Sequence, residues 1–535
     1  MTLKYFNKLA NILNSEDSLS SAAIIVSITY FISAFIGLFR NRILATYFGD
    51  SVELGVFYMA DKLPSFLYSL LVVTAVSSAF IPVFSEYKKK SKKMANLFIS
   101  NILNFSLILY IFFSIFIFIF SDFFSKLISW NSLDENSLSL MSQIMRYILF
   151  SQLVLLVSTY YSIYLQSYKR FILPALVPVF YNTGIILGTL FFYNKFGILA
   201  PSLGMVLGAL FGVVIQLPLM FILGYRHYLY LSLDTGIKKV FKIVVPKILG
   251  VSVHRLYILL VNGLISLIYQ SPSYIVIYEF ANQLQTMPVN AFGSSLSQAM
   301  LPTLSDYAFE KKMVRIRSIL KEYVLKISYF TLPLAIMFFV LRIPLVRLLF
   351  GGDRFSWLGT NLTAYTLAFF SISIWAQTLS VIFSRVFYSF KDSKTPTNIG
   401  IGTLFISFIL SVVFSFYYKM GVWSFALAFS LGSLLNALLL YIYLVKIVGN
   451  FIKSSLFELI KMAYATLFSG LITYLLMIYL DKVVFDTTRT IPLFILTTII
   501  IFIGSLTYVL FTELLGIKYL RDLFFKYTKH SNLVK

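Results

Sequence analysis

Long apolar runs alternate with short polar stretches along the whole chain, and fourteen of these runs are long enough to cross a bilayer. A helix of about 20 apolar residues spans the hydrocarbon core of a membrane. The expected helices cover residues 21–48, 54–84, 97–121, 143–166, 171–194, 197–223, 244–270, 273–303, 321–350, 358–389, 395–418, 421–447, 457–480 and 490–513. The pattern therefore predicts an all-α polytopic membrane protein with about fourteen transmembrane helices.

The loops between these runs alternate in charge. Every second loop is basic, and these loops hold Lys88–Lys90, Lys169 with Arg170, Lys238 with Lys239, Lys311 with Lys312, Lys391 with Lys394, and Lys446 with Lys453. The loops between them are nearly neutral or acidic, as at Asp50 and at Asp134. Since basic loops stay inside, we expect both termini to be cytoplasmic, with a lead-in over residues 1–20 and a basic tail over 514–535.

The two halves of the chain share an internal repeat. The stretch Ser77–Tyr87 (SSAFIPVFSEY) recurs in the second half as Ser297–Tyr307 (SQAMLPTLSDY), and Ser167–Lys169 recurs at nearly the same offset as Ser389–Lys391. A third echo relates Lys195, Gly197 and Gly208 to Lys419, Gly421 and Gly432. Six helices per half is an even number, so the repeats are parallel and enclose a central cleft, as in transporters that work by alternating access.

The repeat gives a plan of the chain. Residues 21–224 form an N-lobe of six helices, 244–448 form a C-lobe of six, and 449–513 add the last two helices. Residues 225–243 are too polar to span and too apolar to float free, so we expect an interfacial linker helix there.

Composition agrees with a membrane protein and narrows its chemistry. The chain of 535 residues is 59% hydrophobic and 12% charged, and it contains no cysteine and only three histidines. A thiolate or histidine metal site is therefore not expected, and neither are a P-loop, a nucleophile–histidine pair or any other enzyme signature. The net charge of +23 lies in the loops, which argues for membrane topology rather than nucleic-acid binding.

Three cationic residues fall inside predicted helices of the cleft, Arg40, Lys62 and Arg255. Charge at membrane depth is costly and marks a functional site unless it pairs or snorkels to the headgroups. Arginine binds phosphate oxygens bidentately and lysine acts as a point charge, so this set favours an anionic cargo. Arg146, Arg342, Arg347 and Arg385 lie near helix ends, where snorkelling explains them, and it is an equal alternative for Arg42.

Two acidic residues share these helices. Asp61 and Glu279 could neutralise part of the site or bind a coupling cation. The alternative is a structural ion pair, for example of Asp61 with Arg40 or Arg42.

Several stretches together resemble the MurJ/MviN family of lipid II flippases, in the multidrug/oligosaccharidyl-lipid/polysaccharide exporter superfamily. The resemblance covers about residues 20–450. It is carried by Phe39–Ala45 (FRNRILA) with Phe48-Gly49, Lys62-Leu63-Pro64, Ser78–Tyr87, Pro246–Val253 (PKILGVSV), Ala281–Leu284 (ANQL) with Pro288, Ala299–Ser305, Leu349–Gly351, and Lys391–Pro396 (KDSKTP) after Phe387-Tyr388.

This resemblance implies a flippase that moves the undecaprenyl-pyrophosphate-linked disaccharide-pentapeptide from the inner to the outer leaflet. It implies a bacterial cytoplasmic membrane, no cofactor, and help from membrane potential or a coupling ion. The family's cleft arginine maps onto Arg40, and its basic residue of the second helix maps onto Lys62. A two-lobed transporter completes its own cleft, so we expect a monomer whose partners are its lipid cargo and membrane lipids.

Several family positions differ here. Arginines common in the family fall at Ala34, Tyr68 and Gln283, and an acidic position falls at Gly55, with Glu53 nearby as a substitute. Arg255 stands where family members are commonly uncharged, and it could compensate for Gln283. We therefore count Arg42, Glu53, Asp61, Glu279 and Gln283 as supporting or ion-coupling candidates.

Two alternatives stay open. One is another exporter of the superfamily, for polysaccharide-lipid units or for drugs by cation antiport, although antiport would favour an acidic, aromatic pocket. The other is a membrane scaffold that has lost transport, which the missing arginines would allow.

Overall fold

The computed structural model of the chain describes residues 19–76, 80–519 and 521, and it divides into two compact units. The first unit contains the residues up to Val276 together with Gly352–Phe355, and the second contains the rest. Most of the predicted lead-in, the end of the tail and residues 77–79 of the repeat lie outside the described residues. The lobe boundaries predicted at residues 224 and 244 come from the sequence repeat, whereas the compact units are defined by packing and divide at Val276. The predicted boundaries are therefore not tested by this division.

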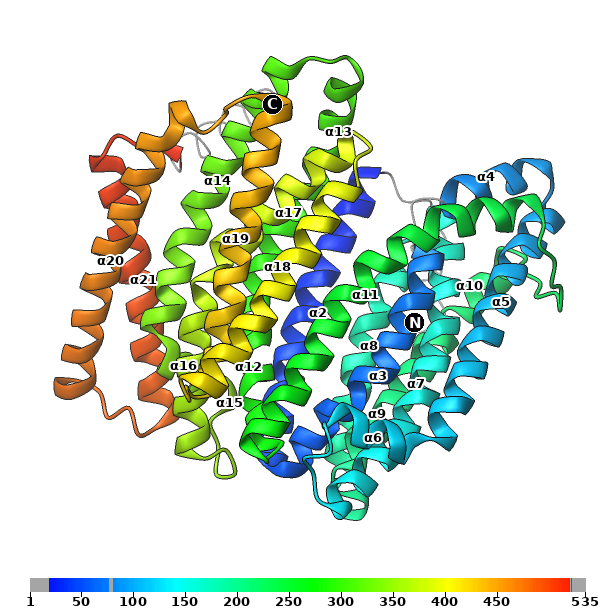
Figure 1. The fold of residues 1–535 in the computed structure, drawn as a ribbon, viewed down its shortest axis with the longest axis horizontal. Helices are drawn as coiled ribbons and strands as arrows, with labels where there is room; N and C mark the ends of the chain where they lie inside the picture. The colour runs from blue at the N-terminus through cyan, green and yellow to red at the C-terminus, as the bar shows by residue number, and fades with distance from the viewer. Residues whose placement is uncertain (1–18, 77–79, 520, 522–535) are drawn as a thin grey trace, which may run out of the picture. The chain divides into compact units, whose positions relative to one another are not determined.

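Helices make up the first unit. They are α2 (Leu19–Phe48), α3 (Val52–Val76), α4 (Phe80–Lys90), α5 (Lys92–Ile119), α6 (Ser121–Ile128), α7 (Glu135–Ser167), α8 (Ile172–Phe196), α9 (Leu199–Val214), α10 (Leu217–Ile222) and α11 (Thr235–Tyr269). The chain passes into the second unit within α12 (Ser273–Pro288), between Val276 and Ile277. Figure 1 shows α11 as a long curved helix that lies beside α3, against which it packs.

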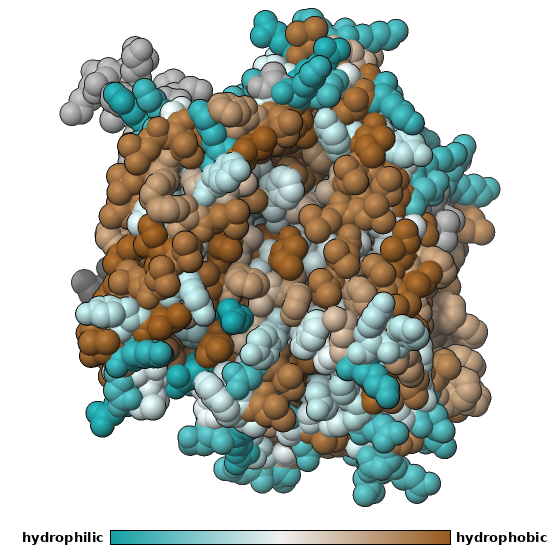
Figure 2. Space-filling model, turned by 60° about the vertical axis from the view of Figure 1, so that its left-hand side comes forward, coloured by the Kyte–Doolittle hydropathy of each residue, from teal (hydrophilic) through white to brown (hydrophobic). Residues whose placement is uncertain are grey.

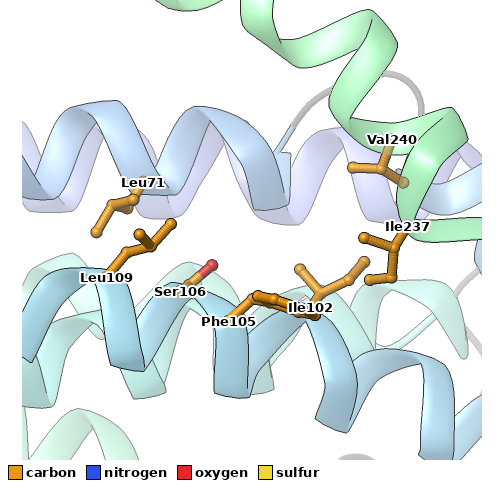
Figure 3. A pocket seen from close by; sticks show the side chains of 7 residues that line it. All are labelled: Leu71, Ile102, Phe105, Ser106, Leu109, Ile237 and Val240. Carbon is orange, nitrogen blue, oxygen red and sulfur yellow. The ribbon is translucent and has the colours of Figure 1, made fainter. Parts of the chain in front are cut away.

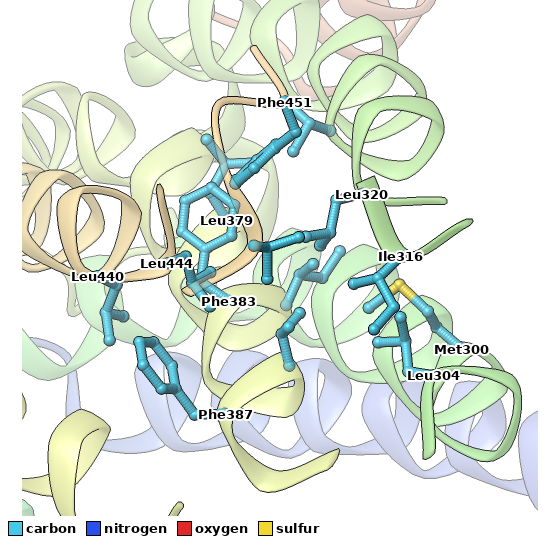
Figure 4. Close-up of a cluster of buried hydrophobic side chains, with 14 of the residues drawn as sticks. Met300, Leu304, Ile316, Leu320, Leu379, Phe383, Phe387, Leu440, Leu444 and Phe451 are labelled. Carbon is cyan, nitrogen blue, oxygen red and sulfur yellow. The ribbon is translucent and has the colours of Figure 1, made fainter. Parts of the chain in front are cut away.

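The second unit is also helical. It continues with a π-helical turn (Val289–Ser294), α13 (Ser295–Phe309), α14 (Met313–Val340), α15 (Arg342–Phe350), α16 (Trp357–Ser371), α17 (Ser373–Ser389), α18 (Lys394–Val412), a second π-helical turn (Val413–Tyr417), α19 (Trp423–Val448), α20 (Leu456–Val483) and α21 (Thr490–Leu514). Its largest core cluster joins α13, α14, α17 and α19, with Leu320, Phe383 and Leu444 fully buried (Figure 4).

The membrane character predicted from the sequence is confirmed. Ten helices in the described part are long and apolar enough to cross a membrane, and α16 with α17, bent by 43°, makes an eleventh. Three predicted spans are not among these. Helices occupy them, α2 at 21–48, α3 and α4 at 54–84, and α12 and α13 at 273–303, but they do not meet the length and hydropathy criteria within the described residues. The count of fourteen therefore stays a prediction. On the face shown in Figure 2, hydrophobic side chains form a band between hydrophilic ones, as lipid contact requires.

The repeat is visible in local geometry. Lys169 and Lys391 both adopt a positive φ, of 58° and 61°, directly after α7 and α17. The amide of Arg170 donates to Leu165 O, and the amide of Asp392 donates to Phe387 O in the same way. The matched sequences therefore close their helices with the same turn.

Helices α8 and α9 approach to backbone contact through glycines. A methyl group on Gly204 would lie 2.4 Å from the carbonyl oxygen of Gly184, and one on Gly188 would lie 2.4 Å from the Cα atom of Gly204. Small residues permit this approach in membranes, where packing rather than hydrophobic force holds helices together.

The predicted interfacial helix over residues 225–243 is wrong in its first part. Residues 225–234 contain no helix, and α11 begins at Thr235, capped by Asp234, whose carboxylate accepts from the amide of Ile237 at 2.8 Å. The reason is that side-chain amides of α5 bond the backbone groups of this segment, which a helix would have used internally.

The short segment Gly352–Phe355 packs in the first unit although its neighbours in sequence belong to the second. Arg354 Nη1 donates to the carbonyl oxygen of Tyr47 at 2.5 Å and to the hydroxyl of Tyr193. Gly49 (φ 64°) leaves room for this contact, since a side chain there would lie 1.9 Å from Arg354 O.

Candidate functional site

The three cationic residues of the predicted site all lie in the first unit, on α2, α3 and α11. At about 1.5 Å per residue, Arg40 lies about 12 Å before the end of α2, Lys62 about 15 Å into α3, and Arg255 about 21 Å before the end of α11. These helix ends belong to the same membrane side, because Gly55 packs directly against Pro272. All three residues are therefore at membrane depth.

Arg40 is oriented by two neutral amides. Its Nη1 donates to Oδ1 of Asn182 on α8 at 2.9 Å, while Nε and Nη2 donate to Oδ1 of Asn41 at 3.1 and 2.9 Å. Asn41 is buried, and the amide of Asn182 donates to the carbonyl oxygen of Pro178 at 3.1 Å. Within the described residues no carboxylate pairs with this guanidinium, so its bonded partners do not neutralise its charge.

Asp61 lies in a second polar group that joins α3 to α7. Its Oδ1 accepts from the hydroxyl of Ser65 at 2.8 Å, and that hydroxyl oxygen accepts from Nε2 of Gln152 at 3.2 Å. Gln152 is buried, and its Oε1 makes no hydrogen bond. In the described part of the chain Asp61 forms no ion pair, so the alternative of pairing with Arg40 or Arg42 is not what the structure shows.

Neighbouring residues of α8 reach the two groups. Asn182 bonds Arg40, and the hydroxyl of Tyr181 accepts from Nε2 of Gln152 at 3.5 Å. The structure therefore brings Arg40 and Asp61 into one region of the first unit.

Lys62 and Arg42 are half-buried on α3 and α2. Lys62 directly follows Asp61, and successive helical residues point about 100° apart, so the two side chains leave α3 on different sides.

Arg255 has an exposed side chain on α11, flanked by the equally exposed His254 and Leu256. Among the residues that the structure describes, its guanidinium makes no hydrogen bond or ion pair. Because α11 packs against α3, the backbone of Arg255 lies in the same unit as Lys62.

The remaining candidates lie elsewhere. Glu53 is exposed in the first turn of α3, about 13 Å along the helix from Lys62, where it suits the positive end of the helix dipole. Glu279 is buried and Gln283 half-buried on α12, one turn apart on a single face. Both belong to the second unit.

Two departures from the family pattern have local explanations. The Cβ atom of an acidic residue at Gly55, in α3, would lie 2.0 Å from the carbonyl oxygen of Pro272, so only glycine fits at this position. Tyr68, at a family arginine position, shares a hydrogen bond of 2.8 Å with the hydroxyl of Thr159.

A pocket lies beneath the start of α11, lined by Leu71 of α3, four residues of α5 around Phe105, and Ile237 and Val240 of α11 (Figure 3). Its lining is almost entirely apolar, and none of the cationic candidates contributes to it. It therefore does not suit a phosphate. The described residues also contain no group of three carboxylate or imidazole side chains that would suit a metal ion.

Sequence reasoning missed the neutral residues of the site, above all Asn182, Gln152 and Ser65. A signal was present, since an amide inside an apolar helix needs a hydrogen-bond partner. The partner of Asn182 is 142 residues away in sequence, however, and no local pattern identifies it.

Fold and site together define a multi-pass α-helical membrane protein with a charged, hydrogen-bonded interior in its first unit. A family model described as lipid II flippase MurJ matches residues 44–491. The chain therefore belongs to the lipid II flippase MurJ family.

Individual relatives agree with this assignment. A probable lipid II flippase MurJ of Buchnera aphidicola subsp. Acyrthosiphon pisum is 28% identical over 94% of this chain and 98% of its own length. A probable lipid II flippase MurJ of Thermotoga maritima is 26% identical over 93% and 97%.

Solved structures show the same fold. A lipid II flippase MurJ in an inward closed conformation matches with a TM-score of 0.77 and 22% identity, over 94% of this chain and 100% of that one. An inward-facing multidrug resistance MATE family transporter of the MOP superfamily matches with a TM-score of 0.66 and 13% identity, over 81% and 99%.

Proposed function

We propose that this protein flips lipid II, the undecaprenyl-pyrophosphate-linked precursor of peptidoglycan, from the inner to the outer leaflet by alternating access. Membership of the lipid II flippase MurJ family supports the proposal. The proposal includes a bacterial cytoplasmic membrane, cytoplasmic termini and a monomer that needs no cofactor and performs no catalysis.

The observation that carries the proposal is the setting of Arg40. A guanidinium has five N–H donors, and the bonds to Asn41 and Asn182 use three of them. One N–H on each terminal nitrogen is left, which is the fork that a phosphate group accepts bidentately. Because both partners are uncharged amides, they do not neutralise the guanidinium, and its positive charge can attract an anionic cargo.

Lys62 and Arg255 supply further positive charge in the same unit, and a pyrophosphate carries enough negative charge to engage more than one cation. In our proposal Lys62 acts as a point charge and Arg255 as a second fork. Arg42, Glu53, Glu279 and Gln283 are supporting candidates.

Asp61 is the candidate for coupling to a proton or cation. Its carboxylate has one hydrogen bond, from Ser65, and Gln152 offers an oxygen without a partner nearby. Protonation or ion binding at Asp61 would change the charge next to Arg40 and so couple cargo release to an ion gradient or to membrane potential.

A drug antiporter is the second candidate function, because the MATE fold matches as well. The cationic set in the first unit disfavours cationic drugs through charge repulsion. Resistance to cationic drugs on expression of this chain would favour that function.

The test is growth rescue in a bacterium whose own flippase is depleted. We expect the chain to restore growth and Arg40→Ala and Arg255→Ala to abolish rescue at equal protein levels in the membrane. Arg342→Ala is the matched control, since Arg342 lies at a helix end near aromatic rings and, among the described residues, its guanidinium bonds only the carbonyl oxygen of Phe339. Rescue that tolerates both Arg40→Ala and Arg255→Ala would refute the site.

A further inference from the structure

The segment of residues 225–234, between α10 and α11, has an unusual position for a non-helical backbone. Figure 1 shows it beside α5 as a coil that descends along the helix and rises again before α11 begins. Non-helical backbone near a membrane must find hydrogen-bond partners in protein or water.

Asparagines of α5 supply these partners. Asn104 Nδ2 donates to the carbonyl oxygens of Tyr228 and Tyr230 at 2.8 and 3.1 Å. Asn101 donates to Ser232 O at 2.8 Å and accepts from Ser232 N at 3.0 Å. The inward edge of the segment is thus bonded to one helix face.

Two further bonds lie nearer the start of α5, and we call Asn96, Ser100, Asn101 and Asn104 together the asparagine ladder. Asn96 Nδ2 donates to Gly224 O at 3.0 Å, and the hydroxyl of Ser100 accepts from Tyr228 N at 3.2 Å. All four side chains of the ladder are buried, so the segment covers them.

The order of these contacts shows that the segment runs along α5 toward the middle of that helix and then turns back; we call this excursion the dip. It enters at the level of Asn96, reaches Asn104 about 12 Å further along α5, and returns to the level of Asn101. Leu229 lies at the lowest point, between Tyr228 and Tyr230, which both bond to Asn104.

The outward side of the dip is apolar. Leu229 is 97% exposed, Leu233 60% and Leu231 52%, while the residues between them bond inward to α5. The three leucines are therefore more than half exposed on a segment whose intervening residues bond α5. Exposure of this much apolar surface to water is unfavourable, whereas contact with lipid is not.

The depth of the dip matches the membrane boundary. The hydrocarbon core needs about 20 residues of α5, and counted back from its end at Ile119 these begin near Ser100. The ladder from Asn96 to Asn104 therefore straddles the boundary between headgroups and hydrocarbon.

Cations surround the top of the dip. Lys92, Lys93, Arg226 and Lys238 are exposed there, and the amine of Lys92 lies against Gly224. Basic residues near an anionic membrane surface are attracted to its headgroups.

We propose that residues 225–234 form a re-entrant lipid anchor, with Leu229, Leu231 and Leu233 inserted in the leaflet on the basic side and the surrounding cations bound to anionic phospholipid headgroups. The asparagine ladder of α5 holds the backbone so that it can enter this layer. The anchor fixes the first turns of α11, the helix that carries Arg255, at a set membrane depth.

The chain contains no cysteine, so a label attached to one introduced cysteine reports on that position alone. Leu229→Cys is spin-labelled in nanodiscs that contain anionic lipid, and its collisions with oxygen and with a soluble nickel chelate are measured. Phe112→Cys on the exposed face of α5 is the deep reference, and Lys311→Cys, at an exposed position in the turn between α13 and α14, is the aqueous control.

We expect the oxygen-to-nickel collision ratio at Leu229 to exceed that at Lys311 several-fold and to approach that at Phe112. A ratio equal to that at Lys311 would overturn the anchor. In nanodiscs without anionic lipid the ratio should fall, and an unchanged ratio would refute the headgroup contact.

Asn104→Ala in the Leu229→Cys background tests the ladder. Loss of its two bonds should lower the oxygen-to-nickel ratio, since bare carbonyl groups cannot enter hydrocarbon. Protein that elutes normally on size exclusion yet keeps the full ratio would show that the ladder does not hold the dip.

Discussion

The two units differ in what they keep in their interiors. The first holds Arg40 and Asp61, each bonded to neutral side chains on neighbouring helices. In the second, Gln377 Nε2 donates to Gln285 Oε1 and Ser373 Oγ, both at 2.7 Å, and the amide of Gln285 continues to Asn282 at 2.9 Å. These bonded residues are neutral, and the buried charge that the second unit holds on α12, Glu279, is acidic rather than cationic.

The repeat makes the contrast sharper, because the offset that relates Ser77–Tyr87 to Ser297–Tyr307 also relates Lys62 to Asn282 and Ser65 to Gln285. Lys62 thus carries a charge where the matching Asn282 carries an amide, and Ser65 carries a hydroxyl where Gln285 carries an amide. The halves share their helices and turns, while the cationic chemistry is concentrated in the first.

Packing differs between the same units. Helices α8 and α9 touch through Gly184 and Gly204, whereas between α18 and α19 a methyl group on Gly432 would meet the hydroxyl of Ser407. Gly402 on α18 has nothing within 4 Å of the position of a Cβ atom. The backbones therefore approach more closely in the first unit's helix pair, since the backbone atom nearest to a methyl group on Gly432 is the carbonyl oxygen of Thr403, at 3.1 Å.

The largest expected effect comes from breaking that approach. Gly204→Leu would force a side chain into the backbone of α8, at a cost of roughly 3 kcal/mol or more. We expect no folded protein on fluorescence-detected size exclusion. Gly402→Leu is the control and should elute as the wild type does, so equal behaviour of both variants would contradict the packing difference.

The second-largest effect is expected from removing a positive charge from the first unit. Arg40→Gln keeps a hydrogen-bonding side chain but removes the charge, and we expect affinity for undecaprenyl pyrophosphate to fall by roughly 30-fold, equivalent to about 2 kcal/mol. Gln377→Ala in the neutral network should leave that affinity within about 3-fold. Native mass spectrometry of purified protein measures both, and equal losses would remove the contrast between the units.

A smaller effect is expected when the first unit is made to neutralise its own charge. Asn182→Asp would pair with Arg40 and compete with phosphate, lowering affinity by about 10-fold while thermal stability is kept or raised. Asn136→Asp adds the same charge at an exposed position in the first turn of α7. If Asn136→Asp weakens binding as much, the effect is one of net charge and not of Arg40.

The smallest effect concerns the caps of α7 and α16, at positions related by the same offset as Ser167–Lys169 and Ser389–Lys391. Asp134 caps α7 by accepting from the amide of Ser137 at 3.4 Å, and Ser356 caps α16 by accepting from the amide of Gly359 at 2.8 Å. Hydrogen bonds from Ser137 hold the pKa of the Asp134 carboxyl below its usual value. A lowered pKa means that the carboxylate stabilises the fold above about pH 4 and loses this contribution as the pH falls.

Asp134→Ala should therefore lower the thermal midpoint slightly at neutral pH and approach the wild type in acid. Ser356→Ala should lower it equally at both pH values, because a hydroxyl does not titrate there. Thermal melts of the two variants across pH decide this, and a pH-independent loss at Asp134 would show that its charge plays no part.

The sequence by itself determined the helices and the turns between them. Apolar runs of sufficient length predict spans because an unpaired backbone cannot remain in lipid, and the echo of Ser167–Lys169 in Ser389–Lys391 predicts the same turn because a few adjacent residues close it. It also identified Arg40, Lys62 and Asp61 as charges at membrane depth.

Only the tertiary structure decided which groups these charges meet and where residues 225–234 lie. Asn182 orients Arg40 across 142 residues, and Asn101 takes backbone bonds of Ser232 across 131. Hydropathy and periodicity report what one segment prefers, whereas a hydrogen-bond partner depends on which helices pack together. Packing against α5 made residues 225–234 a non-helical segment, where composition alone had suggested a helix.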